Sequence, residues 1–145
     1  MTVLCFDPGK TTGWGVLSDG KILGGSFFMW NDINTLIELH NPSTIVCESF
    51  HLRAGAAKHL IGNDFPASQV IGVIKYLADF YDILCVMQVP SIRTGVPLDR
   101  IKGIDRHSRD AIKHGIRYLQ RTDAKQINKY MQYLRYPKCK KQEPV

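Results

Sequence analysis

The first seventeen residues constrain the fold of this chain more than any other stretch. Residues 3–6 form an apolar run that suits a buried strand, and residues 14–17 suit a second strand that returns beside it. The intervening residues 8–13 contain one proline and two glycines, which is typical of a tight turn. The pattern therefore predicts a hairpin, with a carboxylate, Asp7, at the point where its first strand ends.

Asp7 is open to three interpretations. It can cap the backbone of the turn, as aspartates commonly do. It can belong to a phosphate loop, because Gly9-Lys10-Thr11 resembles the end of a Walker A motif. That motif requires a glycine five residues before its Gly-Lys pair, and Leu4 occupies the position, which excludes such a loop. The third interpretation, a metal-binding carboxylate, requires other acids that converge on the same point.

Composition predicts one soluble domain. A chain of 145 residues can bury a real core, and 44% hydrophobic with 22% charged residues is typical of a globular protein. Its apolar runs are far shorter than the ~20 residues that span a membrane, and no basic-then-apolar signal peptide opens the chain. We therefore expect a cytoplasmic protein without membrane contact. Four cysteines (Cys5, Cys47, Cys85 and Cys139) lack metal-site spacing, and the first three lie in apolar runs that predict reduced core residues.

Charge is distributed unevenly along the chain. Residues 1–90 hold 5 Lys or Arg against 8 Asp or Glu, a net charge of −3, whereas residues 91–145 hold 14 against 5, a net charge of +9. An asymmetry of this size favours a polyanion-binding face built largely by the C-terminal third. A solvated basic helix is the alternative explanation.

The rest of the chain predicts strands that alternate with helices. Gly24-Gly25 within the third strand predicts a bulge or a close approach of another backbone. The predicted elements are a strand over 22–30, a helix over 33–40, a strand over 44–48, a loop over 49–65 with one helical turn near 54–60, a helix over 66–81, a strand over 83–89, a loop over 90–103, a helix beginning at Asp105 or Arg106 and a further helix over 123–134. Three antiparallel strands followed by this alternation predict an α/β fold with a mixed five-stranded sheet covered by helices.

Several acids fall where such a fold would bring them together. Asp7 and Glu48 each end an apolar strand, and parallel neighbours would place both carboxylates at one edge of the sheet. On the late helix, His107 and Asp110 share a face at spacing i, i+3, with His114 further along it. Clustered carboxylates are costly without cations, and hard oxygen ligands select Mg²⁺ or Mn²⁺. Each acid alone also has an ordinary explanation as a turn, strand-end or exposed helix residue.

These motifs together resemble the RuvC family of Holliday-junction resolvases, in the RNase H-like and retroviral-integrase superfamily. The resemblance is carried by residues 6–9 (Phe-Asp-Pro-Gly), 12–15 (Thr-Gly-Trp-Gly), 45–48 (Ile-Val-Cys-Glu) and 107–111 (His-Ser-Arg-Asp-Ala), and covers the order of elements over residues 1–121. It implies an RNase H-like nuclease domain over 1–136, with helices on both faces of the sheet, followed by a basic tail over 137–145. The short chain and basic tail favour a phage-type member.

The resemblance also implies a site. Its catalytic and metal-binding residues would be Asp7, Glu48, His107 and Asp110, holding two Mg²⁺ ions, with Mn²⁺ as a substitute. Many family members have an aspartate where this chain has His107, so the imidazole either ligates one metal or orients the nucleophilic water. Asp105 is a less suitable substitute, because it lies off the shared helical face.

DNA contacts are expected from two segments. Family members engage the junction with the loop after the glutamate, and stacking on a base is worth ~1–3 kcal/mol; a hydrophobic plug is the alternative for the aromatic residue. Basic residues near the last acid are candidate phosphate contacts, and Lys102 could also stabilise transition-state charge. The expected DNA-binding residues are Phe50, Arg53, Lys58, Arg93, Arg100, Lys102, Arg106 and Arg109.

The resemblance therefore implies a homodimeric, Mg²⁺-dependent endonuclease acting on four-way or other branched DNA in a bacterial or phage-infected cell. The broad apolar band of the helix over 66–81 suits either a dimer interface or ordinary sheet packing. Two metals would assist in-line attack by water, leaving a 5′-phosphate and a 3′-hydroxyl. The alternatives are a DNA-binding module that never cuts and an actin-like ATP-binding domain, for which one domain of 145 residues is too short.

Overall fold

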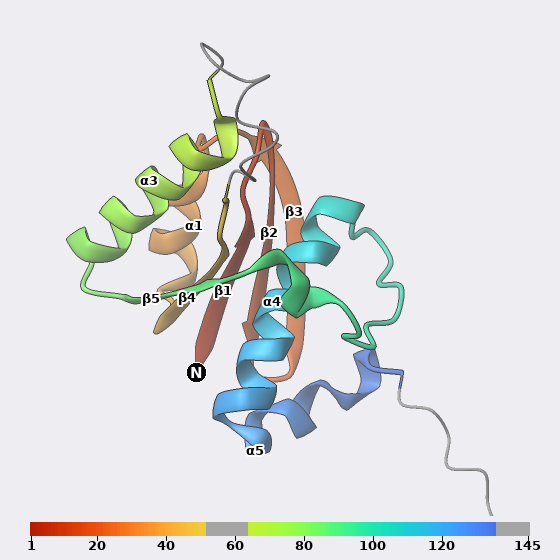
Figure 1. The fold of residues 1–145 in the computed structure, drawn as a ribbon. Coiled ribbons are helices and arrows are strands. Elements are labelled where there is room, and N and C mark those ends of the chain that lie inside the picture. The colour runs from red at the N-terminus through yellow and green to blue at the C-terminus, as the bar shows by residue number, and fades with distance from the viewer. Residues whose placement is uncertain (52–63, 136–145) are drawn as a thin grey trace, which may run out of the picture.

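A five-stranded sheet in the order β3-β2-β1-β4-β5 forms the centre of the molecule in the computed structural model, which describes residues 1–51 and 64–135. Helices cover both faces of this sheet (Figure 1). The strands are β1 (Thr2–Asp7), β2 (Thr11–Ser18), β3 (Lys21–Phe28), β4 (Thr44–Glu48) and β5 (Leu84–Gln88). The helices are α1 (Ile33–His40), α3 (Pro66–Phe80), α4 (Arg106–Thr122) and α5 (Ala124–Ile127), with 3₁₀ turns η1 (Pro90–Arg93) and η2 (Asn128–Tyr133).

The sheet is mixed, as the sequence predicts. β1, β2 and β3 form an antiparallel meander, whereas β4 pairs in parallel with both β1 and β5. β1 is therefore the central strand, where the antiparallel and parallel halves meet. The carboxyl ends of β1, β4 and β5 lie at one edge of the sheet, which is where open α/β folds place their sites.

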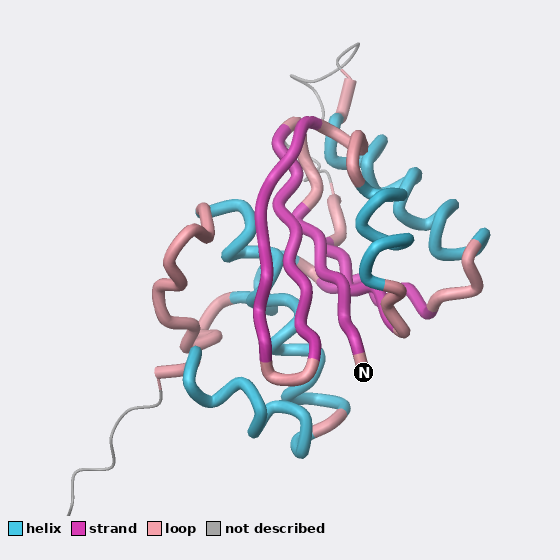
Figure 2. The backbone as a smooth tube through the Cα atoms, turned by 180° about the vertical axis from the view of Figure 1, so that it is seen from behind, coloured by secondary structure: helices cyan, strands magenta, loops and turns pink. Residues whose placement is uncertain are grey.

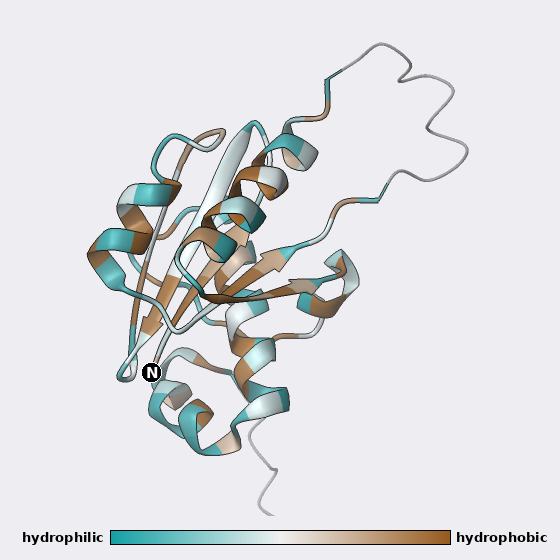
Figure 3. Cartoon of the chain, turned by 90° about the vertical axis from the view of Figure 1, so that its left-hand side faces the viewer, coloured by the Kyte–Doolittle hydropathy of each residue, from teal (hydrophilic) through white to brown (hydrophobic). Residues whose placement is uncertain are grey.

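Alternation along β1 explains why this strand is apolar throughout. Leu4 and Phe6 point to one face of the sheet and pack with α1 and α3, whereas Val3 and Cys5 point to the other and pack with α4. All four side chains are buried. Figure 2 shows the two helical layers on either side of the sheet. Figure 3 shows the hydrophobic strands within it.

Glycines allow α4 to lie unusually close to the sheet. A side chain at Gly13 would overlap the carbonyl group of His107, and one at Gly24 would overlap the Ser108 hydroxyl. The Ser108 hydroxyl donates a hydrogen bond to the Trp14 carbonyl at 2.7 Å. On the helix side, a side chain at Gly115 would overlap the Cys5 sulfur. At Gly13 the backbones of β2 and α4 meet directly, and at Gly24 and Gly115 a side chain of the facing element occupies the space that a Cβ atom would need.

The Gly24-Gly25 pair marks a close approach rather than a bulge. The register between β2 and β3 is unbroken from Thr11 and Phe28 to Ser18 and Lys21. The third strand also ends at Phe28, two residues before the predicted end.

The predicted helix over 123–134 is wrong in its detail. The segment divides into the short helix α5 and the 3₁₀ turn η2. Ile127 and Tyr130 are buried, and Tyr133 packs against the same core. A spacing of three residues matches the three residues per turn of a 3₁₀ helix, so this geometry turns all three side chains inward.

Cys5 and Cys47 are buried free thiols and Cys85 is a partly buried one, as the sequence predicts. Cys139, the helical turn near 54–60 and the tail over 137–145 lie outside the described residues. Among the helices of residues 1–51 and 64–135, none has the length and hydrophobicity to cross a bilayer.

Candidate active site

Three polar residues end neighbouring parallel strands on the same face of the sheet. Asp7 follows Val3 and Cys5 in alternation, so its side chain lies on the α4 side. The pairing of Phe6 with Cys47 places Asp7 beside Glu48, which is in turn paired with Gln88. Glu48 and Gln88 follow Val46 and Val86, which also pack with α4. The ends of β1, β4 and β5 thus direct their polar side chains toward one helix.

Asp105 fixes where that helix begins. Its carboxylate accepts hydrogen bonds from the Ser108 amide at 2.8 Å and the Ser26 hydroxyl at 2.6 Å, an N-cap that joins α4 to β3. Burial raises the pKa of Asp105, but these hydrogen bonds and the nearby His107 outweigh burial, so the pKa is lowered overall. Asp105 therefore serves as a cap, apart from the strand-end acids.

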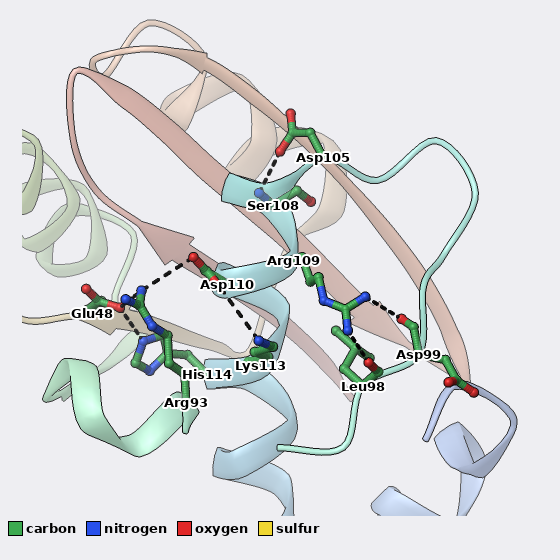
Figure 4. A network of polar contacts seen from close by, with 10 residues as sticks. All are labelled: Glu48, Arg93, Leu98, Asp99, Asp105, Ser108, Arg109, Asp110, Lys113 and His114. Atoms are coloured by element: carbon green, nitrogen blue, oxygen red, sulfur yellow. Dashed lines mark hydrogen bonds and ion pairs between the residues drawn. The ribbon is translucent and has the colours of Figure 1, made fainter. Parts of the chain in front are cut away.

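His114 is the polar centre of the site. Its side chain is fully buried, with Nε2 at 2.7 Å from Glu48 Oε2 (Figure 4). The other ring nitrogen, Nδ1, lies 2.7 Å from Gln88 Oε1. A buried network with both ring nitrogens satisfied holds the glutamate in one orientation. The sequence analysis placed His114 on the helical face of Asp110 without giving it a role, and did not select Gln88. The position of Gln88 at the end of an apolar strand, like Asp7 and Glu48, is the signal that could have identified it.

Arg93 connects the acids of two elements. Its Nη1 atom lies 2.9 Å from Glu48 Oε2 and 3.6 Å from Asp110 Oδ2. Lys113 lies 3.8 Å from the other oxygen of Asp110. Glu48 and Asp110, one from β4 and one from α4, are therefore brought to the same guanidinium group, as Figure 4 shows.

Asp7 differs from the other two acids in its surroundings. Within residues 1–51 and 64–135 its carboxylate forms no hydrogen bond or ion pair, although the residue is partly buried. Desolvation is the main cause that raises its pKa to about 6; Glu48 and Asp110 raise it further, and Arg93 and His114 oppose them. The carboxylates of Glu48 and Asp110 thus lie close enough to Asp7 to disfavour its ionisation.

The raised pKa predicts that Asp7 destabilises the metal-free protein above pH 6. The pKa in the fold exceeds the unfolded value of 3.8, so any stability due to Asp7 is present below pH 4 and is lost as the pH rises through about 6. Asp7→Asn, which stays neutral, should therefore raise the free energy of unfolding by roughly 1–3 kcal/mol at pH 8 and change it little at pH 4. Urea unfolding in EDTA between pH 4 and 8 measures this difference, and an equal difference at both ends would contradict it.

His107 is placed near Asp7 through its backbone. Its carbonyl group lies against Gly13, the cross-strand partner of Asp7, while its side chain is exposed at the start of α4. Among the described residues no hydrogen bond or ion pair joins His107 to Glu48 or Asp110. Its role as a ligand or as a water-orienting group remains a prediction.

Apart from Arg93, the described residues that were predicted to contact DNA lie in two places, after β4 and around the start of α4. Phe50 is partly exposed, and its ring centroid lies 5.9 Å from that of Phe65. Arg109 donates to the carbonyl groups of Leu98 and Asp99, so it also braces a loop (Figure 4). Arg100, Arg106 and Arg109 line a hollow of about 530 Å³ beside the start of α4, and Lys102 is exposed nearby. Arg53 and Lys58 lie outside the described residues.

The carboxylates fit a divalent metal in their chemistry. Asp7, Glu48 and Asp110 offer hard oxygen ligands, and burial, together with the charges of Glu48 and Asp110, raises the pKa of Asp7. In the described part of the chain, however, no three His, Cys, Asp or Glu side chains are gathered around one ion-sized point. Arg93 lies between two of the three acids instead.

The comparisons with known proteins identify the class of fold. The chain has the fold of the solved RuvC structures, a mixed α/β sheet covered by helices. It is similar to the structure of Thermus thermophilus RuvC in complex with a Holliday junction substrate, with 13% identity and a TM-score of 0.63 over 85% of this chain and 96% of that one. A second Thermus thermophilus RuvC structure shares 16% identity and a TM-score of 0.57 over 83% of this chain and 96% of that one. No protein-family model and no curated protein sequence matches the chain.

Proposed function

We propose that this protein is a metal-dependent endodeoxyribonuclease that resolves four-way or other branched DNA. The observation that carries the proposal is the convergence of Asp7, Glu48 and Asp110 at one sheet edge. The fold is shared with a protein whose structure was solved with a Holliday junction substrate, which supports the choice of substrate.

In this proposal the three carboxylates hold two Mg²⁺ ions, or Mn²⁺ in their place. Two such ions activate water and stabilise charge on the attacking and leaving oxygens of a phosphodiester. His107, exposed at the start of α4, either adds a ligand or orients the water. His114 and Gln88 are positioning residues, because His114 holds Glu48, Gln88 holds His114, and both side chains are buried.

The basic C-terminal third supplies the DNA-binding surface. Residues 91–145 have a net charge of +9, and the exposed side chains of Arg100, Lys102 and Arg106 lie at or just before the start of the helix that carries Asp110. Lysine and arginine side chains bind phosphates without regard to base sequence. Recognition of branched DNA would then depend on where these charges lie relative to the acids.

A homodimer would place two such sites on a two-fold symmetric junction. An apolar groove on the outer side of α3 supports this part of the proposal. It is lined by Trp30, Gly72, Val73, Tyr76 and Leu77, and the Tyr76 side chain is 67% exposed. Exposed aromatic residues beside a groove are typical of protein–protein interfaces.

The test is nicking of a mobile four-way junction, compared with linear duplex of the same sequence. With Mg²⁺ or Mn²⁺ we expect paired nicks on opposing strands of the junction and no nicks with EDTA. Asp7→Asn should lower the nicking rate by at least roughly 10²–10³-fold, because a carboxylate at the reacting centre is lost. A gel-shift assay without metal should show that the variant still binds the junction.

Two other results would count against the proposal. Junction binding that is the same in both proteins, without cleavage in any metal, would indicate a DNA-binding module that never cuts. Equal nicking of linear duplex and junction would retain the nuclease and contradict the preference for branched DNA.

A further inference from the structure

Arg93 lies where the acids of the site converge. It is the last residue of η1, the 3₁₀ turn that follows β5 in the chain. Its Nη1 atom lies 2.9 Å from Glu48 Oε2 and 3.6 Å from Asp110 Oδ2. Figure 4 shows the guanidinium group between the two carboxylates, with the His114 ring bound to the same Glu48 oxygen. The sequence analysis expected Arg93 to contact phosphate, whereas here it contacts two acids.

The contact between Arg93 and Glu48 involves a carboxylate oxygen that would also be a ligand of a bound metal. Glu48 Oε2 accepts from both Arg93 and His114, so this oxygen already has two close donors. A guanidinium group is permanently charged and does not release its protons at any ordinary pH. Arg93 is therefore a constant positive charge between Glu48 and Asp110, and Lys113 adds a second positive charge at the other oxygen of Asp110.

We propose that Arg93 is an internal counter-ion that competes with the divalent metal, and that metal binding requires its side chain to leave Glu48 and Asp110. This inference rests on the proposed function, because it assumes that these acids bind the metal. It gives Arg93 a role before DNA arrives, in addition to any contact with phosphate.

The surroundings allow the Arg93 side chain to leave while the site remains intact. The side chain is 34% exposed, so solvent lies beside it, whereas His114 is fully buried. Arg117 donates to the carbonyl groups of Ile92 and Thr94 at 3.3 and 3.4 Å, which holds the backbone on both sides of Arg93. Rotation of one side chain therefore suffices, with the η1 turn and His114 staying in place.

Mn²⁺ binding by the DNA-free protein tests the inference. Electron paramagnetic resonance of free Mn²⁺ gives the Kd for the wild type, for Arg93→Gln and for Arg121→Gln. Arg121, exposed in the last turn of α4, is a matched control for the loss of one charge. We expect Arg93→Gln to lower the Kd for Mn²⁺ roughly tenfold, since a charge-assisted hydrogen bond no longer opposes binding. Arg121→Gln should stay within about twofold of the wild type, because exposed charges this far away are screened.

The outcomes separate this inference from the proposed function. If the wild type binds Mn²⁺ through Asp7, as loss of binding in Asp7→Asn would show, an equal or weaker affinity in Arg93→Gln overturns the inference alone. If neither the wild type nor Arg93→Gln has a Mn²⁺ site that depends on Asp7, both proposals fail. Arg93→Lys provides a second variant should circular dichroism show that Arg93→Gln is unfolded. The Kd of Arg93→Lys for Mn²⁺ should be lower than that of the wild type, by less than about tenfold.

Discussion

Gly13→Ala is expected to destabilise the protein by several kcal/mol and to abolish any nicking. The added methyl group would overlap the His107 carbonyl and approach the Ser108 amide nitrogen to 2.7 Å, and both belong to the backbone of α4. Because a helix backbone cannot yield as a flexible side chain can, the whole N-terminal turn of α4 must move away from β2. Overpacking of this kind costs about 1–3 kcal/mol in an adaptable core, and more where backbones collide. Urea unfolding followed by circular dichroism measures the cost.

Gly72→Ala is the matched control for this change. Gly72 lies in the interior of α3, and nothing lies within 4 Å of an added side chain. Alanine in place of glycine inside a helix should stabilise the protein by about 0.5–1 kcal/mol. If Gly13→Ala unfolded at the same urea concentration as Gly72→Ala, the close contact between α4 and the sheet would be refuted.

His114→Ala should destabilise the protein strongly, whereas His107→Ala should not. Removal of the fully buried His114 leaves a cavity and takes a partner from both Glu48 and Gln88, which together cost about 2–4 kcal/mol. His107 is exposed, so its truncation should change the free energy of unfolding by no more than about 0.5 kcal/mol. Thermal unfolding of the two variants in EDTA measures the contrast.

Loss of activity is expected for both histidines, and stability is what separates them. Under the proposed function, both variants should nick four-way junctions poorly, but only His114→Ala should also have a lowered Tm. Equal stability of the two variants would show that the network around Glu48 contributes nothing to the fold. Normal nicking by His107→Ala would remove this residue from the site.

Much of the fold could be predicted because its signals are local. The turn residues after Asp7 and the apolar runs before Asp7 and Glu48 indicate strands, and the mixed sheet with both acids at one edge follows from their order. Strand alternation would also have placed Gln88 on the same face, once the end of its strand was known.

Other features depend on contacts that no local pattern contains. The spacing of His107 and Asp110 puts them on one face of the helix. How closely α4 approaches the sheet, however, is set by Gly13, Gly24 and Gly115. At that distance the second and third turns of the helix reach Glu48, while the His107 side chain stays exposed. The position of Arg93 could not be predicted either, because a loop arginine reaches acids or phosphates according to the path of its backbone.

The close seating of α4 on the sheet has a consequence for the order in which the protein acquires activity during synthesis. Asp7 and Glu48 belong to the first third of the chain, and Asp110 emerges from the ribosome about sixty residues later. Since N-terminal segments are made first, the sheet edge exists for some time without the helix that completes its acids. The growing chain therefore holds two isolated carboxylates and lacks a complete site. Only docking of α4 along the glycines of β2 and β3 brings the third acid to them, so this docking is the step that completes the proposed nuclease site.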